Sequence, residues 1–319
     1  MSVMPPWAAP PSPEPAAPKL HTPTADEIKQ VKDDNAKGVI HGTEERPHGI
    51  HTMDQLLPEK PTVKDGFVEL GNLKVQADKY KEFRDALVYE SKNPEMNGIV
   101  ENLEKGPRKT TVTMNTSSHN DTKPRASGDA DVQWDPTHMN IAGNDAKRSP
   151  ATRLAHELDH AEHYERDPQQ HMILRAAKDK DFANLEEKRV ITGSERRNVH
   201  ALGEGERDSH HTGKGNFEVK SVTSTTPVLH QTRDGATTEV PASYNQTGKI
   251  SLTDDSVVQD IGRGKTVQYD RKEFEGLVGK TALESAAHDG KPMNVSIADG
   301  EFKLSEARTP AREVDHARR

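Results

Sequence analysis

The chain alternates between stretches with a clear apolar period and stretches that have none. Between residues 77 and 91, Tyr80, Phe83 and Leu87 fall at helical spacing and predict a helix. A β-branched, alternating run at 109–114 predicts a strand. Other elements are expected at 25–33, 96–103, 170–178 and 183–202 for helices and at 131–134 for a second strand.

The best-defined helix is predicted over residues 150–165. Leu154, Leu158 and Ala161 lie at i, i+4 and i+7, which places an apolar stripe beside a polar one. Ser149 is a suitable N-cap, and the proline that follows it suits the first turn. The pattern predicts an amphipathic helix with one face on a core.

After residue 216 the pattern changes to short alternating segments separated by turn residues. Hairpin turns are expected at 232–235, 246–248 and 298–300. A short helix is expected at about 271–287, and 308–319 has the composition of a charged tail. This part of the chain is predicted to be small and rich in β structure.

The first 65 residues show no sustained period and begin with a Pro/Ala/Ser-rich stretch, so we expect a disordered leader and linker there. The predicted organisation has three parts: the leader at 1–65, an α+β domain at 66–225 and a β-rich region at 226–319.

Composition agrees with a chain that is folded only in part. Hydrophobic residues make up 31%, aromatic residues 4% and charged residues 30%, too little apolar matter for a core along 319 residues. The net charge of −8 provides no basic field that would recommend nucleic acid as a partner. No apolar run is long enough for a membrane span, and no secretory signal peptide is expected.

The absence of cysteine limits the chemistry further. With no cysteine, the chain can have neither disulfides, nor a thiolate nucleophile, nor a zinc site built on thiolates. A metal ion would have to be bound by histidine and carboxylate side chains.

The predicted helix at 150–165 carries such side chains, because residues 156–160 form the pattern HExxH. His156 and His160 stand four residues apart, so they share a helix face and can bind one metal ion. Glu157 is adjacent to the first histidine, where a carboxylate can act as general base. This pattern predicts one zinc ion in a hydrolase site.

A third metal ligand has to come from elsewhere in the chain. A third histidine six residues after His160 is excluded, because position 166 is arginine. A glutamate on a later helix is the alternative, and Glu195 is favoured, since apolar positions on its predicted helix allow packing against the first helix. The other candidates are Glu186, Glu187, Glu204 and Glu206.

An oxyanion formed during hydrolysis needs a cation or hydrogen-bond donor near the metal. Arg207 and His211 are the residues we expect to serve, with His210 as the alternative. His163 and Asp159 flank the metal-binding pattern, and Asp159 is a candidate for orienting a ligand histidine.

Several of these motifs together resemble one protein family. They are Val132-Gln133-Trp134-Asp135-Pro136, Pro150, the stretch from Leu154 to Ala161, Glu187-Lys188-Arg189-Val190-Ile191, Gly193-Ser194-Glu195, and Leu202-Gly203-Glu204 with Arg207. This combination resembles the NleD-like zinc metallopeptidase effectors, which bacteria deliver by type III secretion. The resemblance covers about residues 70–225, and the ligand spacing is more remotely similar to that of clostridial neurotoxin light chains.

The resemblance implies a zincin-like fold, with His156, His160 and Glu195 as zinc ligands and Glu157 as base. It also implies a protein that is secreted by a bacterium and cleaves a host protein in the host cytoplasm; in one branch of the family the targets are stress-activated MAP kinases. We expect a monomer, with a secretion chaperone at the N-terminus as a further candidate partner.

Two other functions stay open from the sequence. One is an effector that binds a host protein without catalysis and retains a zinc site. The other is a zinc hydrolase of a non-peptide amide, which would have a small closed cleft where a protease needs an open groove.

Overall fold

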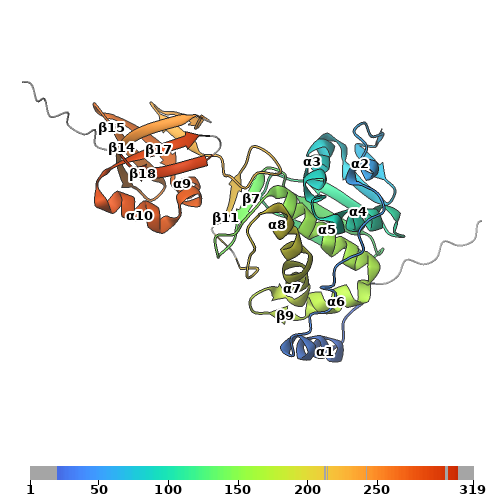
Figure 1. The fold of residues 1–319 in the computed structure, drawn as a ribbon. Coiled ribbons are helices and arrows are strands. Elements are labelled where there is room, and N and C mark those ends of the chain that lie inside the picture. Colours follow the sequence, from blue (N-terminus) through green and yellow to red (C-terminus); the bar gives the residue numbers. More distant parts are fainter. Residues whose placement is uncertain (1–19, 212, 214, 242, 299–300, 308–319) are drawn as a thin grey trace, which may run out of the picture.

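The structure, a computed structural model, describes residues 20–211, 213, 215–241, 243–298 and 301–307. It is a mixed α/β structure in which the described residues form four sheets. In Figure 1 the strands and helices that follow residue 228 lie to one side of the remaining elements. Among the described residues, no helix combines the length and the apolar character that crossing a membrane requires.

The first sheet has six strands in the order β1-β2-β3-β4-β6-β5. The pairs β3–β4 and β4–β6 are parallel, and the other pairs are antiparallel. The strands are β1 (Val63–Lys64), β2 (Phe67–Leu70), β3 (Leu73–Gln76), β4 (Thr110–Met114), β5 (Asp121–Pro124) and β6 (Ala130–Trp134).

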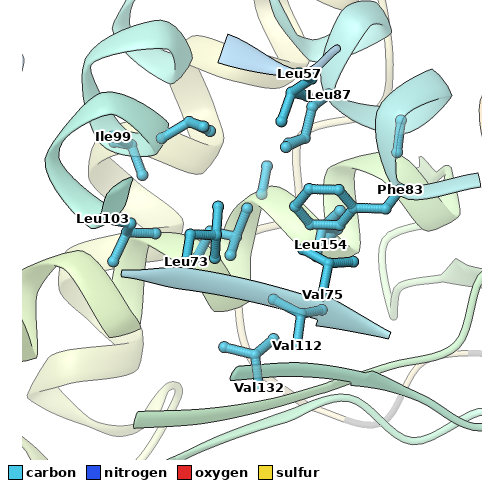
Figure 2. Packing of buried hydrophobic residues seen from close by; sticks show 14 of the residues in the cluster. Leu57, Leu73, Val75, Phe83, Leu87, Ile99, Leu103, Val112, Val132 and Leu154 are labelled. Atoms are coloured by element: carbon cyan, nitrogen blue, oxygen red, sulfur yellow. The ribbon is translucent and has the colours of Figure 1, made fainter. Parts of the chain in front are cut away.

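Helices cover this sheet and enclose the main apolar core. They are α2 (Met53–Leu56), α3 (Tyr80–Glu90), which follows the short 3-10 turn η1 (Ala77–Lys79), α4 (Pro94–Lys105) and α5 (Pro150–Arg166). Figure 2 shows Leu154 of α5 among Val75 and Val112 of the sheet and Phe83 of α3. The apolar stripe predicted on α5 therefore packs between the sheet and its neighbouring helices.

The rest of this region extends the polar side of α5. The helical elements are α6 (Pro168–Ala176), α7 (Leu185–Val190), the π-helical turn η2 (Ile191–Glu195) and α8 (Arg196–Leu202). A hairpin joins β9 (Lys178–Asp179) to β10 (Ala183–Asn184), and a three-stranded sheet has the order β11-β7-β8. Its strands are β7 (His138–Ile141), β8 (Lys147–Arg148) and β11 (Gly215–Glu218).

The C-terminal part is a seven-stranded antiparallel sheet with its own apolar core. The order is β13-β12-β16-β15-β14-β17-β18, and two helices pack on it. The elements are β12 (His230–Arg233), β13 (Ala236–Glu239), β14 (Tyr244–Leu252), β15 (Ser256–Gly262), β16 (Lys265–Asp270), α9 (Arg271–Val278), α10 (Lys280–Asp289), β17 (Pro292–Ala298) and β18 (Glu301–Glu306).

The helices predicted at 77–91, 96–103, 150–165 and 170–178 are confirmed, as are the strands at 109–114 and 131–134. The expected hairpin at 246–248 is wrong, because these residues lie inside β14. A Cβ atom on Gly248 would stand 2.1 Å from the carbonyl oxygen of Asp260 on β15. The glycine therefore permits a close approach between strands and does not make a turn.

The segment expected to be a linker differs from that expectation from residue 20 onward. Helix α1 (Ala25–Ala36) packs on α6, and the segment 40–50, here called the strap, crosses α4 and α5. In the strap, Arg46 is only 5% exposed. The strap has few apolar residues and is held by ion pairs. Hydrophobic periodicity does not reveal contacts of this kind. The predicted boundaries at 65 and 225 stay a prediction; residues 1–19 and 308–319 lie outside the described residues.

Candidate metal centre

Helix α5 begins with a well-formed cap. The Ser149 side chain accepts a hydrogen bond from the Thr152 backbone, as expected for an N-cap. Glu204 adds a carboxylate at the same end, where it accepts from the Ser149 backbone and the Thr152 hydroxyl. Negative charge at a helix N-terminus is favourable, so the start of the helix is fixed before its metal-binding turn. Glu204 is thereby engaged away from the two histidines.

His156 and His160 direct their Nε2 atoms toward one point. These atoms are 3.1 Å apart, and the Glu187 carboxylate lies 3.1 Å from His156 Nε2 and 3.4 Å from His160 Nε2. Ligand atoms around a tetrahedral zinc ion are separated by about 3.3–3.4 Å when the Zn–N distance is near 2.0–2.1 Å. The three side chains have the spacing of a zinc ligand set.

Each imidazole is held from behind through its Nδ1 atom. His156 Nδ1 lies 2.7 Å from Glu195 Oε2, and His160 Nδ1 lies 3.0 Å from Glu186 Oε1. An ionised carboxylate can only accept a hydrogen bond. Each Nδ1 therefore has to be the donor, and we assign it a proton. Both Nε2 atoms are then left with lone pairs, which is the form of histidine that binds metal.

These lone pairs test whether a metal ion fits. If both Nε2 atoms are unprotonated, these two atoms at 3.1 Å and the carboxylate at 3.1 and 3.4 Å repel one another, unless a bound cation or an added proton lies between them. A divalent cation at that point would satisfy all three groups at once. The donor set, two imidazoles and one carboxylate, is one that zinc accepts in hydrolases.

The electrostatics of the centre agree with this fit. Burial disfavours the charged form of His160, but Glu187 and Glu186 outweigh burial and raise its pKa to about 10. Burial likewise opposes charge on His156, yet hydrogen bonds to Glu187 and Glu195 raise its pKa. For Glu187, burial is outweighed by the two histidines, and its pKa falls well below the usual range. The surrounding carboxylates therefore stabilise positive charge at the two histidines.

Glu195, the favoured third ligand from the sequence, lies on the opposite side of His156 from the Nε2 atoms. Its carboxylate contacts His156 Nδ1 and pairs with two arginines: Arg207 donates to both oxygens at 2.7 Å, and Arg148 lies 3.3 Å away. The structure thus brings Glu187, one of the alternatives, to the Nε2 atoms, and Glu195 to the Nδ1 side. The assignment of Glu195 as a ligand stays a prediction. Glu206 pairs with Arg196 and His200, outside the centre.

Glu186 shows why two consecutive glutamates meet different partners. Successive positions on a helix point about 100° apart, so Glu187 faces the Nε2 atoms while Glu186 faces the back of the cluster. The Glu186 oxygens accept from His160, His163 and, twice, Arg189, at 2.8 to 3.0 Å. Four acceptor sites are then filled. Although His163, His171 and Glu186 also stand close enough for a metal ion, Glu186 is occupied as a support.

Asp159 lies on the same buried side of α5. It pairs with Arg189 of α7 and with Arg46 of the strap, and the Ser194 hydroxyl donates to it. It contacts neither imidazole by a hydrogen bond, so its role differs from the orienting role considered from the sequence. Asp159 connects α5 to two distant segments.

Glu157 lies next to His156 and borders two adjoining cavities. Its side chain is 8% exposed, and Oε2 accepts a hydrogen bond of 2.7 Å from the Thr122 hydroxyl. The larger cavity, about 430 Å³, and the smaller one, about 190 Å³, both have His156 and Glu157 in their walls. A carboxylate in this position can exchange protons with groups in either cavity.

The expected oxyanion donors are distributed unequally. Arg207 is 7% exposed, with Nη2 3.2 Å from His156 Nδ1, and it borders the larger cavity. His210 Nε2 lies 3.4 Å from Glu187, and burial lowers the pKa of His210 to about 4, which Glu187 only partly offsets. His211 also borders the larger cavity, but its side chain is 63% exposed and 3.9 Å from Asp181. His210 is therefore nearer the histidine pair than His211.

Sequence reasoning missed Thr122, Arg148 and Arg153, all of which border the cavities or contact the centre. Thr122 and Arg148 are single residues in short strands, without any spacing pattern. Arg153 had one available signal, since it precedes His156 by three positions and so lies one helical turn away on the same side.

The comparisons with known proteins concern the segment that contains this centre. Residues 72–213 match the family model Peptidase_M91, which is described as "Effector protein". No curated protein and no solved structure gave a match to the chain. The matched segment includes α5, both cavities' shared residues and Arg207, and it excludes the strap and the seven-stranded sheet. The family name indicates a peptidase. The match supports the resemblance to the NleD-like effectors for this segment: residues 72–213, less than half of the chain, are similar to the Peptidase_M91 effector family.

Proposed function

We propose that this protein is a zinc-dependent endopeptidase of the effector type. The observation that carries the proposal is the convergence of His156 Nε2, His160 Nε2 and the Glu187 carboxylate within 3.1–3.4 Å, beside Glu157. In this proposal Glu187 is the third ligand, and Glu195 orients His156 from the Nδ1 side. The family assignment of residues 72–213 supports peptidase chemistry.

When bound, one zinc ion supplies Lewis-acid chemistry, because it polarises a carbonyl group and lowers the pKa of water toward neutrality. The remaining steps belong to the chain. Glu157 accepts the proton of the attacking water and then transfers it to the leaving amine. The Thr122 hydroxyl holds Glu157 Oε2 in place at 2.7 Å, so the carboxylate keeps one orientation through both transfers.

Negative charge that develops on the substrate carbonyl oxygen requires a donor. We assign this role to Arg207 or His210, which border the larger cavity with His156. Because its pKa is about 4, His210 is neutral at pH 7 and can donate one N–H. His211, which the sequence favoured alongside Arg207, is the more exposed of the two histidines.

A peptide substrate suits the cavities better than a small amide does. The two cavities adjoin along His156 and Glu157, so an extended chain can lie across the centre with side chains on both sides. A hydrolase of a small non-peptide amide would need one enclosed pocket. This arrangement therefore favours an endopeptidase over that alternative.

The family description also guides where the protein acts. An effector acts on a host molecule, so we propose secretion by a bacterium, a host cytoplasmic protein as substrate and a zincin-like fold for the peptidase region. We further propose a monomer with one zinc ion, and binding of a secretion chaperone at the N-terminus.

The test is a comparison of the zinc-loaded protein with Glu157→Gln in host-cell lysate. New protein N-termini are identified by mass spectrometry, and zinc content is measured for both proteins. We expect new N-termini only with the unsubstituted protein, equal zinc content, and loss of cleavage by roughly 10²–10⁴-fold in the variant, the usual contribution of a general base.

A chelator provides the second arm. Removal of zinc should abolish cleavage, and restored zinc should recover it. If zinc binds and yet no cleavage distinguishes the two proteins, the result supports the alternative of a non-catalytic effector that binds a host protein.

A further inference from the structure

The larger cavity beside Glu157 has a wall of cationic side chains. Arg148, Arg153 and Arg207 all border it, and each is 9% exposed or less. Apart from Glu157, its described lining residues include no carboxylate; the others are polar or glycine, among them Asn140 and Asn216. A buried wall of this kind requires compensation of its charge.

That compensation is incomplete within the described part of the chain. Arg148 and Arg207 share a single carboxylate, that of Glu195. The Nε atom of Arg148 is buried and has no hydrogen-bond partner. Two guanidinium groups opposite one carboxylate leave a positive charge at the cavity wall.

Arg153 adds a second positive charge. Its Nη1 and Nη2 atoms donate to the backbone carbonyls of His138 and Ser118, at 2.7 and 2.8 Å. These carbonyls hold the guanidinium in place without neutralising it. Arg153 forms no ion pair in the described part of the chain, although Asp135 and Glu157 lie near enough to interact with its charge. A planar guanidinium has five N–H groups, so donors remain for a ligand.

The smaller cavity on the other side of Glu157 has the opposite character. Asp121, Glu186 and Glu187 border it, with Arg175 as its only described arginine or lysine. The two sides of the centre therefore differ in charge, and a substrate chain that crosses Glu157 meets a cationic wall on one side only.

We propose that the larger cavity is a substrate subsite for an anionic side chain, a carboxylate or a phosphate, held by Arg148 and Arg153 next to the scissile bond. This inference rests on the proposed peptidase function. Since consecutive residues of an extended peptide are about 3.3–3.6 Å apart, and the cavity begins at His156 and Glu157, the anionic side chain belongs to a residue within two positions of the cleaved bond.

The experiment uses the full-length, zinc-loaded protein and a randomised peptide library, with cleaved products identified by mass spectrometry. We expect one position within two residues of the cleaved bond to be enriched in Asp or Glu. A matched pair of peptides with Glu or Gln at that position should then differ in kcat/KM by roughly tenfold to a hundredfold, the range for hydrogen bonds to charged groups.

Substitutions assign the preference to the cavity. Arg153→Met should bring the Glu/Gln ratio of kcat/KM toward one, whereas Arg153→Lys, which keeps the charge, should retain part of it. Arg125→Met is the matched control, because Arg125 is an exposed arginine that pairs with Asp131 outside both cavities; its ratio should equal that of the unsubstituted protein. If Arg153→Met does not fold, Asn216→Asp adds a carboxylate to the same wall and should reverse the preference toward Gln.

A peptide with phosphoserine at the same position distinguishes the two sources of negative charge. A higher kcat/KM than for the Glu peptide identifies phosphate as the better ligand, and a lower one identifies carboxylate; both support the subsite. Equal cleavage of the Glu, Gln and phosphoserine peptides overturns it.

Binding to zinc-loaded Glu157→Gln, measured by calorimetry with the same three peptides, separates the inference from the function on which it rests. Preference for the anionic peptides in binding, without cleavage by the unsubstituted protein, would contradict the peptidase function and retain the subsite. Cleavage without any anionic preference would contradict the subsite and retain the peptidase function.

Discussion

The two faces of helix α5 are both buried, but they are stabilised in different ways. The apolar face, Ala151, Leu154, Leu158 and Ala161, packs in the core between the six-stranded sheet and its helices. The polar face, His156, Asp159, His160 and His163, is 7% exposed or less and is surrounded by carboxylates and guanidinium groups. One face depends on excluded water, and the other on matched charges.

The partners of the two faces also differ in what each can tolerate. An apolar contact that is lost leaves a cavity, whereas a charged group that loses its partner leaves an uncompensated charge in a medium of low dielectric constant. The candidate metal centre is thus positioned on one side by packing and on the other by a charge network. Each prediction below changes one face and compares the outcome with the other.

The largest effect is expected from Asp159→Ala. This change leaves Arg46 and Arg189 without their shared carboxylate, and breaking a buried ion pair costs about 3–5 kcal/mol. Urea denaturation monitored by circular dichroism measures the loss. The control is Asp131→Ala, which removes a more exposed pair with Arg125 and should cost about 0–1 kcal/mol. Equal losses for the two variants would show that the charge network does not support the helix.

Leu158→Ala tests the apolar face. Leu158 is fully buried, and truncation of a buried leucine costs about 2–5 kcal/mol. Zinc affinity, measured by competition with a chromogenic chelator under conditions where the variant is folded, should change less than tenfold, because the ligand network is untouched. A loss of zinc affinity comparable to that of a ligand variant would mean that the two faces are not independent.

Glu195→Gln and Glu187→Gln separate the Nδ1 side from the Nε2 side of the histidines. Glu195→Gln should weaken zinc binding by roughly 10–100-fold, the usual cost of losing a group that orients a ligand. Glu187→Gln should weaken it more, because a proposed ligand is removed. Competition with the same chromogenic chelator measures the zinc affinity of both variants. The opposite order would restore Glu195 as the third ligand, as the sequence suggested.

The most gradual effect, spread over several pH units, concerns the pH dependence of stability near the start of α5. Burial raises the pKa of Glu90 to about 8 from 4.5, while hydrogen bonds from Asn198 and Thr152 only partly oppose this. Between these two pH values the folded protein holds a proton that the unfolded chain has released. Stability from this group is therefore present below pH 4.5 and lost as pH rises toward 8, by about 1.4 kcal/mol per pH unit.

Urea denaturation at several pH values between 5 and 8 measures this slope. In Glu90→Gln the amide cannot titrate, so the variant should lose that part of the pH dependence. An unchanged slope in the variant would assign the dependence to other groups.

The sequence predicted one face of α5 far better than the other. Leu154, Leu158 and Ala161 repeat at the helical period, and the HExxH pattern identified His156, Glu157 and His160, since both signals are local. The partners of these histidines come from positions 26 to 39 residues away along the chain. Periodicity cannot tell Glu187 from Glu195, because both are single carboxylates on helices that return to α5.

The burial of Arg46 could not be predicted from the sequence for the same reason. Its segment has few apolar residues, and low hydrophobicity predicted a linker, but its ion pairs with Asp159 and Glu162 bury it. A polar segment is ordered when its charges have buried partners, and those partners are more than a hundred residues away. The prediction of a turn at 246–248 was wrong because the sequence does not distinguish a glycine required by two closely spaced strands from a glycine in a turn.

The position of Arg46 has a consequence for the order in which the molecule can form. A chain that folds from its N-terminus has to keep this residue uncommitted until Asp159, 113 positions later, is available. A fragment that starts at residue 72, where the family match begins, contains the histidines and Glu187. It lacks Arg46, so Asp159 loses one of its two arginine partners. The structural unit around the candidate metal centre therefore extends beyond the matched segment and includes the strap, which precedes it in the chain.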